Sequence, residues 1–391
     1  MTPAEEQLAL EQGGPAWRIW LRTGLAPTEP KLLVRRALLF AGICWLPLLV
    51  LSARDGLAMG DAVRVPFLRD FSAYARFLFA VVLLVLADAA VPARLRRVLL
   101  QFREARLIPR ETEPGFVAIL QKARRHVDST VAELVVLALA VLAAWSSARR
   151  ELGSGIATWQ ALIGVDGMKS LTVAGWWHAL VSVPLFQFLF LRWGFRLLVW
   201  AQVLARISRL DLRLVATHPD RAAGLGFMAL GQSGFAILVL VGSASLASVL
   251  AEDVVYRGAT LQSLYPLIGA FALLALVFAL GPLLAFTPRL AALKREALYE
   301  YGALSSRHDA AFRDKWLTLK AEAEELLGNE DASSLADLTT GYERAKALRP
   351  VPIDLQAIAP IILAAALPMI PLIALQVPLV DILKGLARVL M

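Results

Sequence analysis

Residues 71–97 read FSAYARFLFAVVLLVLADAAVPARLRR, a long apolar run that is followed at once by three arginines. A helix of about twenty apolar residues crosses the hydrocarbon core of a bilayer. Basic residues collect at the cytoplasmic ends of such helices. This stretch therefore predicts a membrane-spanning helix that ends on the cytoplasmic side.

Six further apolar stretches resemble it. The seven predicted spans lie near 37–53, 71–91, 129–147, 175–203, 227–250, 262–286 and 355–378. Arg192 and Arg196 interrupt the fourth, and Pro360, Pro368 and Pro371 predict a kink in the seventh. The composition agrees, because 58% of the residues are hydrophobic and only 18% are charged, whereas a soluble domain carries about a quarter charged residues. We predict an all-α fold, a polytopic transmembrane helical bundle with amphipathic cytoplasmic helices.

The chain divides into four predicted parts. They are a cytoplasmic N-terminal segment (1–36), a bundle of six spans with cytoplasmic helices at 92–128 (37–286), a cytoplasmic helical segment (287–353), and the last span with an amphipathic tail on the outer leaflet (354–391). We expect a second helix near 116–129 to run into the third span. We expect the external loop 148–174 to form a small surface helix, with Trp159 at the membrane interface.

The basic residues are distributed unevenly among the connectors. Of the 40 Lys and Arg, 28 fall on the side of the N-terminus, 10 on the other side and 2 within the fourth span. The positive-inside rule then predicts a cytoplasmic N-terminus and an external, periplasmic C-terminus. The net charge of +8 fits connectors that face anionic lipid headgroups, and we expect no nucleic-acid partner.

The composition also indicates a compartment. The abundance of Ala, Leu and Arg is typical of a bacterial protein, and we expect the inner (plasma) membrane. Residues 1–30 are polar, so no cleavable signal peptide is predicted. Cys44 is the only cysteine, which excludes an intramolecular disulfide.

Four ionisable residues in the predicted spans form the first candidate site: Asp88, Glu133, Arg192 and Arg196. All four are expected near the cytoplasmic leaflet. An unpaired charge in hydrocarbon is costly, so such residues are functional candidates. Two interpretations stay open. The four groups neutralise one another and lock the helices, or they line a polar cavity or ion path.

The segment ATHPDRAAGLGF (216–227) is the second candidate. Its HPD tripeptide and its glycine spacing imitate motifs of co-chaperones and dinucleotide-binding proteins, but the helical, membrane-bound context excludes both. A helix N-terminus here would hold an anion such as a lipid phosphate. The residues of this anion or headgroup site are His218, Asp220, Arg221, Gly224 and Gly226. The alternative is a tight turn with internal capping.

Signatures of catalysis are missing from the sequence. The four histidines have no metal-ligand spacing, and no P-loop, nucleophile elbow or zinc-protease motif occurs. We therefore expect no catalytic residues, no metal, no cofactor and no enzymatic activity.

Two segments are candidates for protein contacts. The amphipathic helices of 289–350, with a stop at Gly328, either pack on each other and on the span ends or dock a cytosolic protein. The fifth span carries small residues, among them Gly231, Gly234, Gly242 and Ser243. Small residues allow helices to approach closely in lipid, within one bundle or between subunits of a homo-oligomer.

HPDRAAGLGF before a span, then FRDKWL, then EDASSLADL and a proline pair before a proline-rich last span resemble a family of uncharacterised bacterial multi-pass membrane proteins. In that family the cytoplasmic stretch commonly reads SADIQSLADL, so Asp331 and the residues 335–338 match and the Ile-Gln pair does not. The resemblance covers about residues 190–375. It implies that 216–227 and 325–352 belong to one cytoplasmic unit, and it implies no activity.

The leading hypothesis is a channel- or transporter-like protein with a polar site near the cytoplasmic leaflet. The alternative is a membrane scaffold or signalling protein that binds a cytosolic partner through 289–350. An enzyme that acts on lipid has the least support, since only the 216–227 motif favours it.

The charge distribution makes a direct prediction. A reporter enzyme that is active only in the cytoplasm and is fused at residue 320 will be active, because ten Lys and Arg lie between the sixth and seventh spans. Recovery of this fusion in the periplasm would contradict the orientation.

Overall fold

The computed structural model describes residues 13–24, 30–164, 167–318 and 330–374. Within these residues, seven helical segments are long and apolar enough to cross a membrane. They are Lys31–Arg54, Phe71–Glu104, Thr130–Leu152, Val173–Ile207, Phe227–Arg257, Leu261–Leu317 and Leu355–Leu372. The prediction of an all-α, multi-pass membrane bundle is confirmed.

Several spans are composite helices. The first four consist of α3 (Pro30–Arg54); α4 (Phe71–Ala73), the π-helix η2 (Tyr74–Ala80) and α5 (Val81–Glu104); α7 (Thr130–Leu152); and α8 (Val173–Trp177), the π-helix η3 (His178–Ser182) and α9 (Val183–Ile207). The others consist of α10 (Phe227–Gln232), η4 (Ser233–Phe235) and α11 (Ala236–Arg257); α12 (Leu261–Leu280), η5 (Gly281–Phe286) and α13 (Thr287–Arg313); and α15 (Leu355–Ala366), η7 (Leu367–Met369) and α16 (Ile370–Ala374). The fourth span stays helical through both of its arginines, and the seventh changes to a 3₁₀ turn at Pro368, where a kink is expected.

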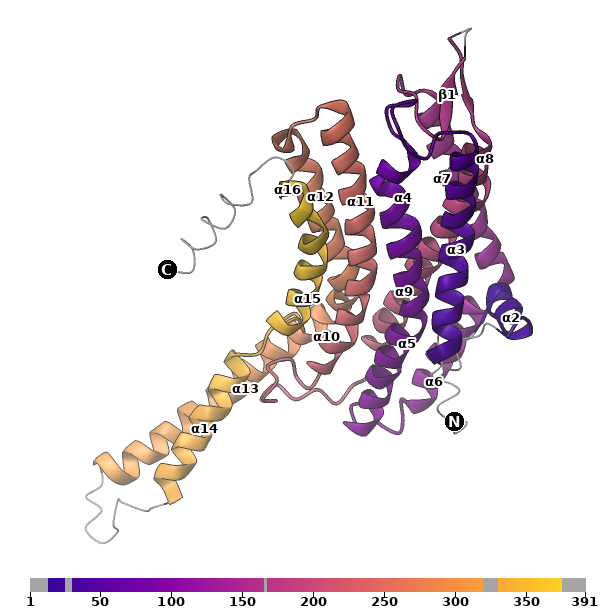
Figure 1. The fold of residues 1–391 in the computed structure, drawn as a ribbon. Coiled ribbons are helices and arrows are strands. Elements are labelled where there is room, and N and C mark those ends of the chain that lie inside the picture. The colour runs from indigo at the N-terminus through magenta and orange to yellow at the C-terminus, as the bar shows by residue number, and fades with distance from the viewer. Residues whose placement is uncertain (1–12, 25–29, 165–166, 319–329, 375–391) are drawn as a thin grey trace.

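The spans form two groups that lie side by side (Figure 1). One group contains α3, α5, α7 and α9, and the other contains α11, α12 and α15. The two groups meet where α11 packs against α4, η2 and α5, where α10 packs against α5, and where η5 packs against α9.

The connectors rich in Lys and Arg share one end of the bundle. This end carries α2 (Pro15–Arg22), α6 (Glu113–Val127), the loop before α10, and the exit of α13 (Figure 1). The opposite end carries the short 3₁₀ helix η1 (Phe67–Arg69) and a hairpin of β1 (Ala161–Ile163) and β2 (Lys169–Leu171), which pair antiparallel.

Two local predictions are wrong. The expected surface helix in 148–174 is the β1–β2 hairpin. Trp159 is fully buried, because its ring packs against Phe67 and His178 and its indole N–H donates to the Asp70 carboxylate at 2.7 Å. The helix before the third span does not run into it. It ends at Val127, and α7 begins afresh at Thr130, since the Ser129 hydroxyl accepts from the Ala132 N–H at 3.3 Å and caps the new helix.

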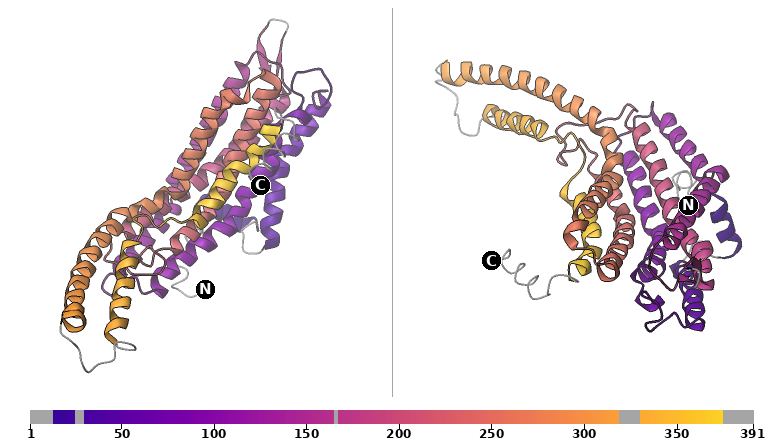
Figure 2. Two further views of the ribbon diagram at one scale, coloured as in Figure 1. Left: turned by 90° about the vertical axis from the view of Figure 1, so that its left-hand side faces the viewer. Right: turned by 90° about the horizontal axis from the view of Figure 1, so that it is seen from above.

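The sixth span continues into a two-helix arm. The chain passes through α13 and the π-helix η6 (Asp314–Thr318), and it returns as α14 (Glu330–Lys346), which packs along α13. Figures 1 and 2 show this arm standing clear of the bundle. Polar contacts join its helices, including Lys315 to Asp331 (2.7 Å) and His308 to Ser334 (2.9 Å). The expected stop at Gly328 and the amphipathic tail beyond 374 lie outside the described residues.

The small residues of the fifth span pack within this chain. The Ser243 hydroxyl donates to the Ala365 carbonyl at 2.6 Å, which joins α11 to α15. A Cβ added at Gly231 would lie 2.1 Å from a methyl group of Val98, so the glycine permits the close approach of α10 to α5.

Candidate functional site

Asp88 on α5 lies between two arginines that come from other spans. Its carboxylate contacts Arg36 of α3 at 2.5 Å and Arg196 of α9 at 2.9 Å. The three side chains are 6%, 0% and 8% exposed, respectively. Arg36 also donates to the Val85 carbonyl at 3.4 Å. One carboxylate thus ties the first, second and fourth spans together.

Glu133 on α7 forms the next ion pair. One of its oxygens lies 3.6 Å from Nε of Arg192, which is one helical turn before Arg196 on α9. Its other oxygen accepts from the Ala16 N–H at 3.1 Å. Asp128 accepts from the neighbouring Gly14 N–H at 2.9 Å. Two carboxylates of the third span and its entry therefore hold the N-terminus of α2.

Trp20, near the end of α2, lies between two guanidinium groups. The guanidinium carbons of Arg36 and Arg192 both lie 4.3 Å from the centre of its ring. Cations over the face of an indole are attracted by its quadrupole. The indole is buried, so α2 covers the charged residues from the basic end of the bundle.

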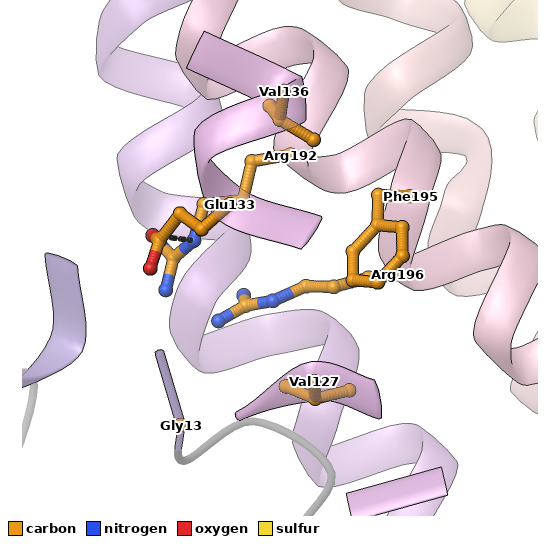
Figure 3. A pocket seen from close by; sticks show the side chains of 7 residues that line it. All are labelled: Gly13, Val127, Glu133, Val136, Arg192, Phe195 and Arg196. Atoms are coloured by element: carbon orange, nitrogen blue, oxygen red, sulfur yellow. Dashed lines mark ion pairs between the residues drawn. The ribbon is translucent and has the colours of Figure 1, made fainter. Parts of the chain in front are cut away.

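We call Arg36, Asp88, Glu133, Arg192 and Arg196 the polar centre. It borders a small, partly open pocket of about 20 Å³, which is room for about one water molecule. Figure 3 shows Arg192 turned toward Glu133 and the guanidinium of Arg196 pointing into the same space. Its other walls are Gly13, Val127, Val136 and Phe195.

The polar centre carries an excess of positive charge. Three guanidiniums meet two carboxylates. Three donor atoms, Nε and Nη1 of Arg36 and Nη2 of Arg192, and one acceptor atom, Oε1 of Glu133, have no hydrogen-bond partner among the described residues. A buried donor without an acceptor is costly. The three donor atoms could therefore donate hydrogen bonds to one more negative or electron-rich group.

The structure brings all four predicted intramembrane residues into this centre, as two ion pairs. Arg36 and Trp20 were missed. The first span was predicted to begin at residue 37, whereas α3 begins at Pro30, so Arg36 lies inside the helix. Proline favours the first turn of a helix, and Pro30 was the signal that could have moved the boundary.

The 216–227 segment is a compact turn, and α10 begins only at Phe227. The Asp220 carboxylate accepts from the N–H groups of Ala222 (2.8 Å), Gly224 (3.1 Å) and Gly226 (2.8 Å). His218 Nδ1 lies 2.8 Å from the same carboxylate. The amide groups that would hold an external anion thus surround an anion of the chain itself. An external headgroup at these residues stays a prediction.

These hydrogen bonds act on the acidity of Asp220. Partial burial raises its pKa, but the three backbone N–H groups and His218 together outweigh burial and lower the pKa below the ordinary aspartate value. A lowered pKa means that the ionised carboxylate stabilises the fold at neutral pH, and that this contribution is lost as the pH falls below the ordinary value.

The same turn contacts the end of the arm. Arg349, which follows α14, donates its backbone N–H to the Arg221 carbonyl (2.8 Å) and its Nη2 to the Asp220 carbonyl (3.1 Å). The turn and the segment before the last span are therefore joined directly.

Two acidic residues, buried Asp70 and half-buried Glu252, lie together at the opposite end of the bundle. Asp70 caps α4 by accepting from the Ala73 N–H (2.8 Å), and Glu252 of α11 accepts from the adjacent Ser72 N–H (2.9 Å). Asp70 also accepts from Trp159. Both acids fell just outside the predicted spans, at the residue before 71 and two residues after 250, so the sequence analysis missed them.

Within the described residues, no group of three or more His, Cys, Asp or Glu side chains could hold a metal ion. Comparison with family models, with curated proteins and with solved structures found no match for this chain.

The polar centre makes a prediction about stability. Asp88→Asn leaves Arg36 and Arg196 without their shared carboxylate, and it will lower the free energy of unfolding by about 3 to 5 kcal/mol, the usual cost of breaking a buried ion pair. Thermal unfolding in detergent measures this loss. Asp61→Asn is the matched control, because Asp61 is 97% exposed in its pair with Arg69, and it will leave the stability unchanged. Equal stability of the two variants would contradict the prediction.

Proposed function

We propose that the protein is channel- or transporter-like and moves a small anion through the polar centre. The observation that carries the proposal is the charge balance of this centre, in which three buried arginines face two acids. A net positive charge within a membrane bundle is costly unless a counter-charge accompanies it. A small anion supplies that charge, and the unpartnered guanidinium atoms of Arg36 and Arg192 supply its hydrogen bonds.

In this proposal α2 is the closing element. Its N-terminal end is held by Glu133 and Asp128, Trp20 fills the space between Arg36 and Arg192, and Gly13 forms a wall of the pocket. A pocket with room for about one water molecule is too small to pass an anion, so passage requires α2 to move.

The π-helices support the proposal. Single π-helical turns are frequent at functional sites because they displace one residue from the regular ladder. η2 and η3 interrupt the second and fourth spans, which supply Asp88, Arg192 and Arg196.

We further propose that the membrane is a bacterial inner membrane and that the end with α2 and the arm is cytoplasmic. The gathering of basic connectors at that end supports this orientation. The resemblance to the uncharacterised family of multi-pass proteins stays a proposal as well. The contact of Arg349 with Asp220 and Arg221 supports the joint unit that it implies.

Anion flux tests the function. Purified protein in liposomes will pass chloride or nitrate down a gradient, and Trp20→Ala will raise this flux by about thirtyfold, because two cation–π contacts of about 1 kcal/mol each no longer hold α2 in place. Trp20→Phe, which keeps an aromatic ring, will stay close to the native flux.

Trp145→Ala is the matched control. Trp145 is half exposed on α7 and also lies under an arginine, Arg149, at 5.3 Å, but it is remote from the polar centre. Absence of anion flux from both the native protein and Trp20→Ala would refute the proposal, as would an equal flux of potassium ions.

A specific observation favours a second candidate function, a scaffold that binds a cytosolic protein. The arm of α13 and α14 stands clear of the bundle, and it exposes Tyr299 (81%) and Leu317 (76%). The two helices pack along each other, but of α13 only Leu290 and Ala297 are buried, so the pair leaves most of its apolar surface uncovered. A partner that covers these side chains would stabilise the arm.

Photo-crosslinking in cells tests this second candidate. A photoreactive amino acid in place of Tyr299 will give one discrete heavier product. The same amino acid in place of Leu363, which is exposed on the membrane-spanning α15, will not give that product. Identical patterns at the two positions, or no product at Tyr299, would count against the scaffold.

A further inference from the structure

A groove outside the polar centre lies between the end of α5 and α10. It has a volume of about 580 Å³ and is open to the surroundings of the protein. Arg94, Arg97 and Gln101 form its polar side, and Phe227 and Leu230 form an apolar side. A groove of this composition suits a ligand that is anionic at one end and apolar at the other.

The groove lies at the boundary of the membrane. Arg94 follows Phe71, the start of the second span, by 23 residues, a helical rise of about 35 Å, which is slightly more than the thickness of the hydrocarbon core. Phe227 begins the fifth span from the same end of the bundle. The arginines are therefore at the depth of lipid headgroups, and the apolar side lies where acyl chains begin.

The two arginines are available for an anion. Arg94 and Arg97 are three residues apart, so they lie on one face of α5. Both are exposed, and neither forms an ion pair with a described acidic residue. Arginine binds phosphate oxygens through two parallel N–H groups.

Glycines of the fifth span shape the groove. A Cβ added at Gly234 would lie 3.1 Å from Cδ of Arg94, so the arginine stem lies directly over this glycine. The close contact of Gly231 with Val98 brings α10 against α5 beneath it. The Leu230 side chain is 57% exposed and continues the apolar side toward the bilayer.

We propose that this groove binds the phosphate-bearing headgroup of an anionic phospholipid, with Arg94 and Arg97 on the phosphate and Phe227 and Leu230 along the first part of the acyl chains. The site is separate from the polar centre, and it does not depend on the proposed transport. It also differs from the 216–227 turn, where Asp220 already occupies the backbone amides.

Native mass spectrometry of the full-length protein in detergent, titrated with phosphatidylglycerol or phosphatidylcholine, tests the proposal. We expect one saturable site that prefers phosphatidylglycerol. The double variant Arg94→Gln/Arg97→Gln will weaken phosphatidylglycerol binding by about thirtyfold, the combined effect of two basic residues near a lipid phosphate. Arg94→Lys/Arg97→Lys keeps the charge and will retain most of the affinity, which separates loss of charge from loss of fold.

Arg110→Gln/Arg125→Gln is the matched control. Both arginines are exposed on the connector between the second and third spans, at the same end of the bundle, and neither lines the groove. This variant removes the same charge and will bind phosphatidylglycerol as the native protein does. An equal loss of affinity in the control would overturn the proposal. The lipid would then be attracted by the total positive charge at this end of the bundle and not by the groove.

Two further results would overturn it. Equal binding of phosphatidylcholine would show that the groove does not distinguish an anionic headgroup from a zwitterionic one. Displacement of the lipid by millimolar inorganic phosphate, with the same dependence on Arg94 and Arg97, would identify a soluble phosphate as the ligand instead of a lipid.

Discussion

A charge that is buried in a membrane bundle needs a partner of opposite sign, and Asp88 provides that partner to two arginines at once. Arg36 comes from α3 and Arg196 from α9, so one carboxylate on α5 fixes the relative depth and rotation of three spans. Glu133 adds α7 through Arg192, and it adds α2 through the Ala16 N–H. Apolar side chains alone specify such an arrangement poorly in lipid, because lipid tails are as apolar as the side chains.

The second group of spans is fastened in a different way. Small side chains and single hydrogen bonds predominate there, such as Ser243 to Ala365 between α11 and α15. At the far end, Glu252 of α11 joins α4 through the Ser72 N–H. The half of the bundle that contains the charges is therefore held by ion pairs, and α11 is attached to it by close packing and one buried carboxylate. Such a division would allow α2 to move without disturbing α11, α12 and α15.

The sequence predicted the number of spans and where most of them begin, because hydropathy measures the energy of placing each stretch in hydrocarbon. The helices extend beyond most of the predicted ends, because the apolar pattern stops where the hydrocarbon does and the helix does not. The sequence also identified Asp88, Glu133, Arg192 and Arg196 as residues that needed partners.

The sequence did not predict which residues pair, since pairing depends on the rotation of each helix about its axis. Arg36 illustrates this limit. It was counted among the residues that precede the first span, whereas it lies within α3 and is fully buried. Trp159 shows another limit. A tryptophan near a membrane surface is expected at the interface, and its burial depends on Asp70, Phe67 and His178, which come from distant parts of the chain. The arm was predicted as helices, but nothing in its periodicity indicated that it would stand clear of the bundle.

Asp88 and Arg196 should stabilise the bundle through their contact with each other, and a double-mutant cycle measures that contact. The variants are Asp88→Asn, Arg196→Gln and the two combined, with unfolding measured in lipid bilayers. We expect a coupling energy of at least about 1 kcal/mol, since residues in direct contact are coupled by about 0.5 to 3 kcal/mol. If the effects of the two substitutions add within about 0.3 kcal/mol, as they do for distant sites, the two charges act independently and Asp88 does not hold the spans together through Arg196.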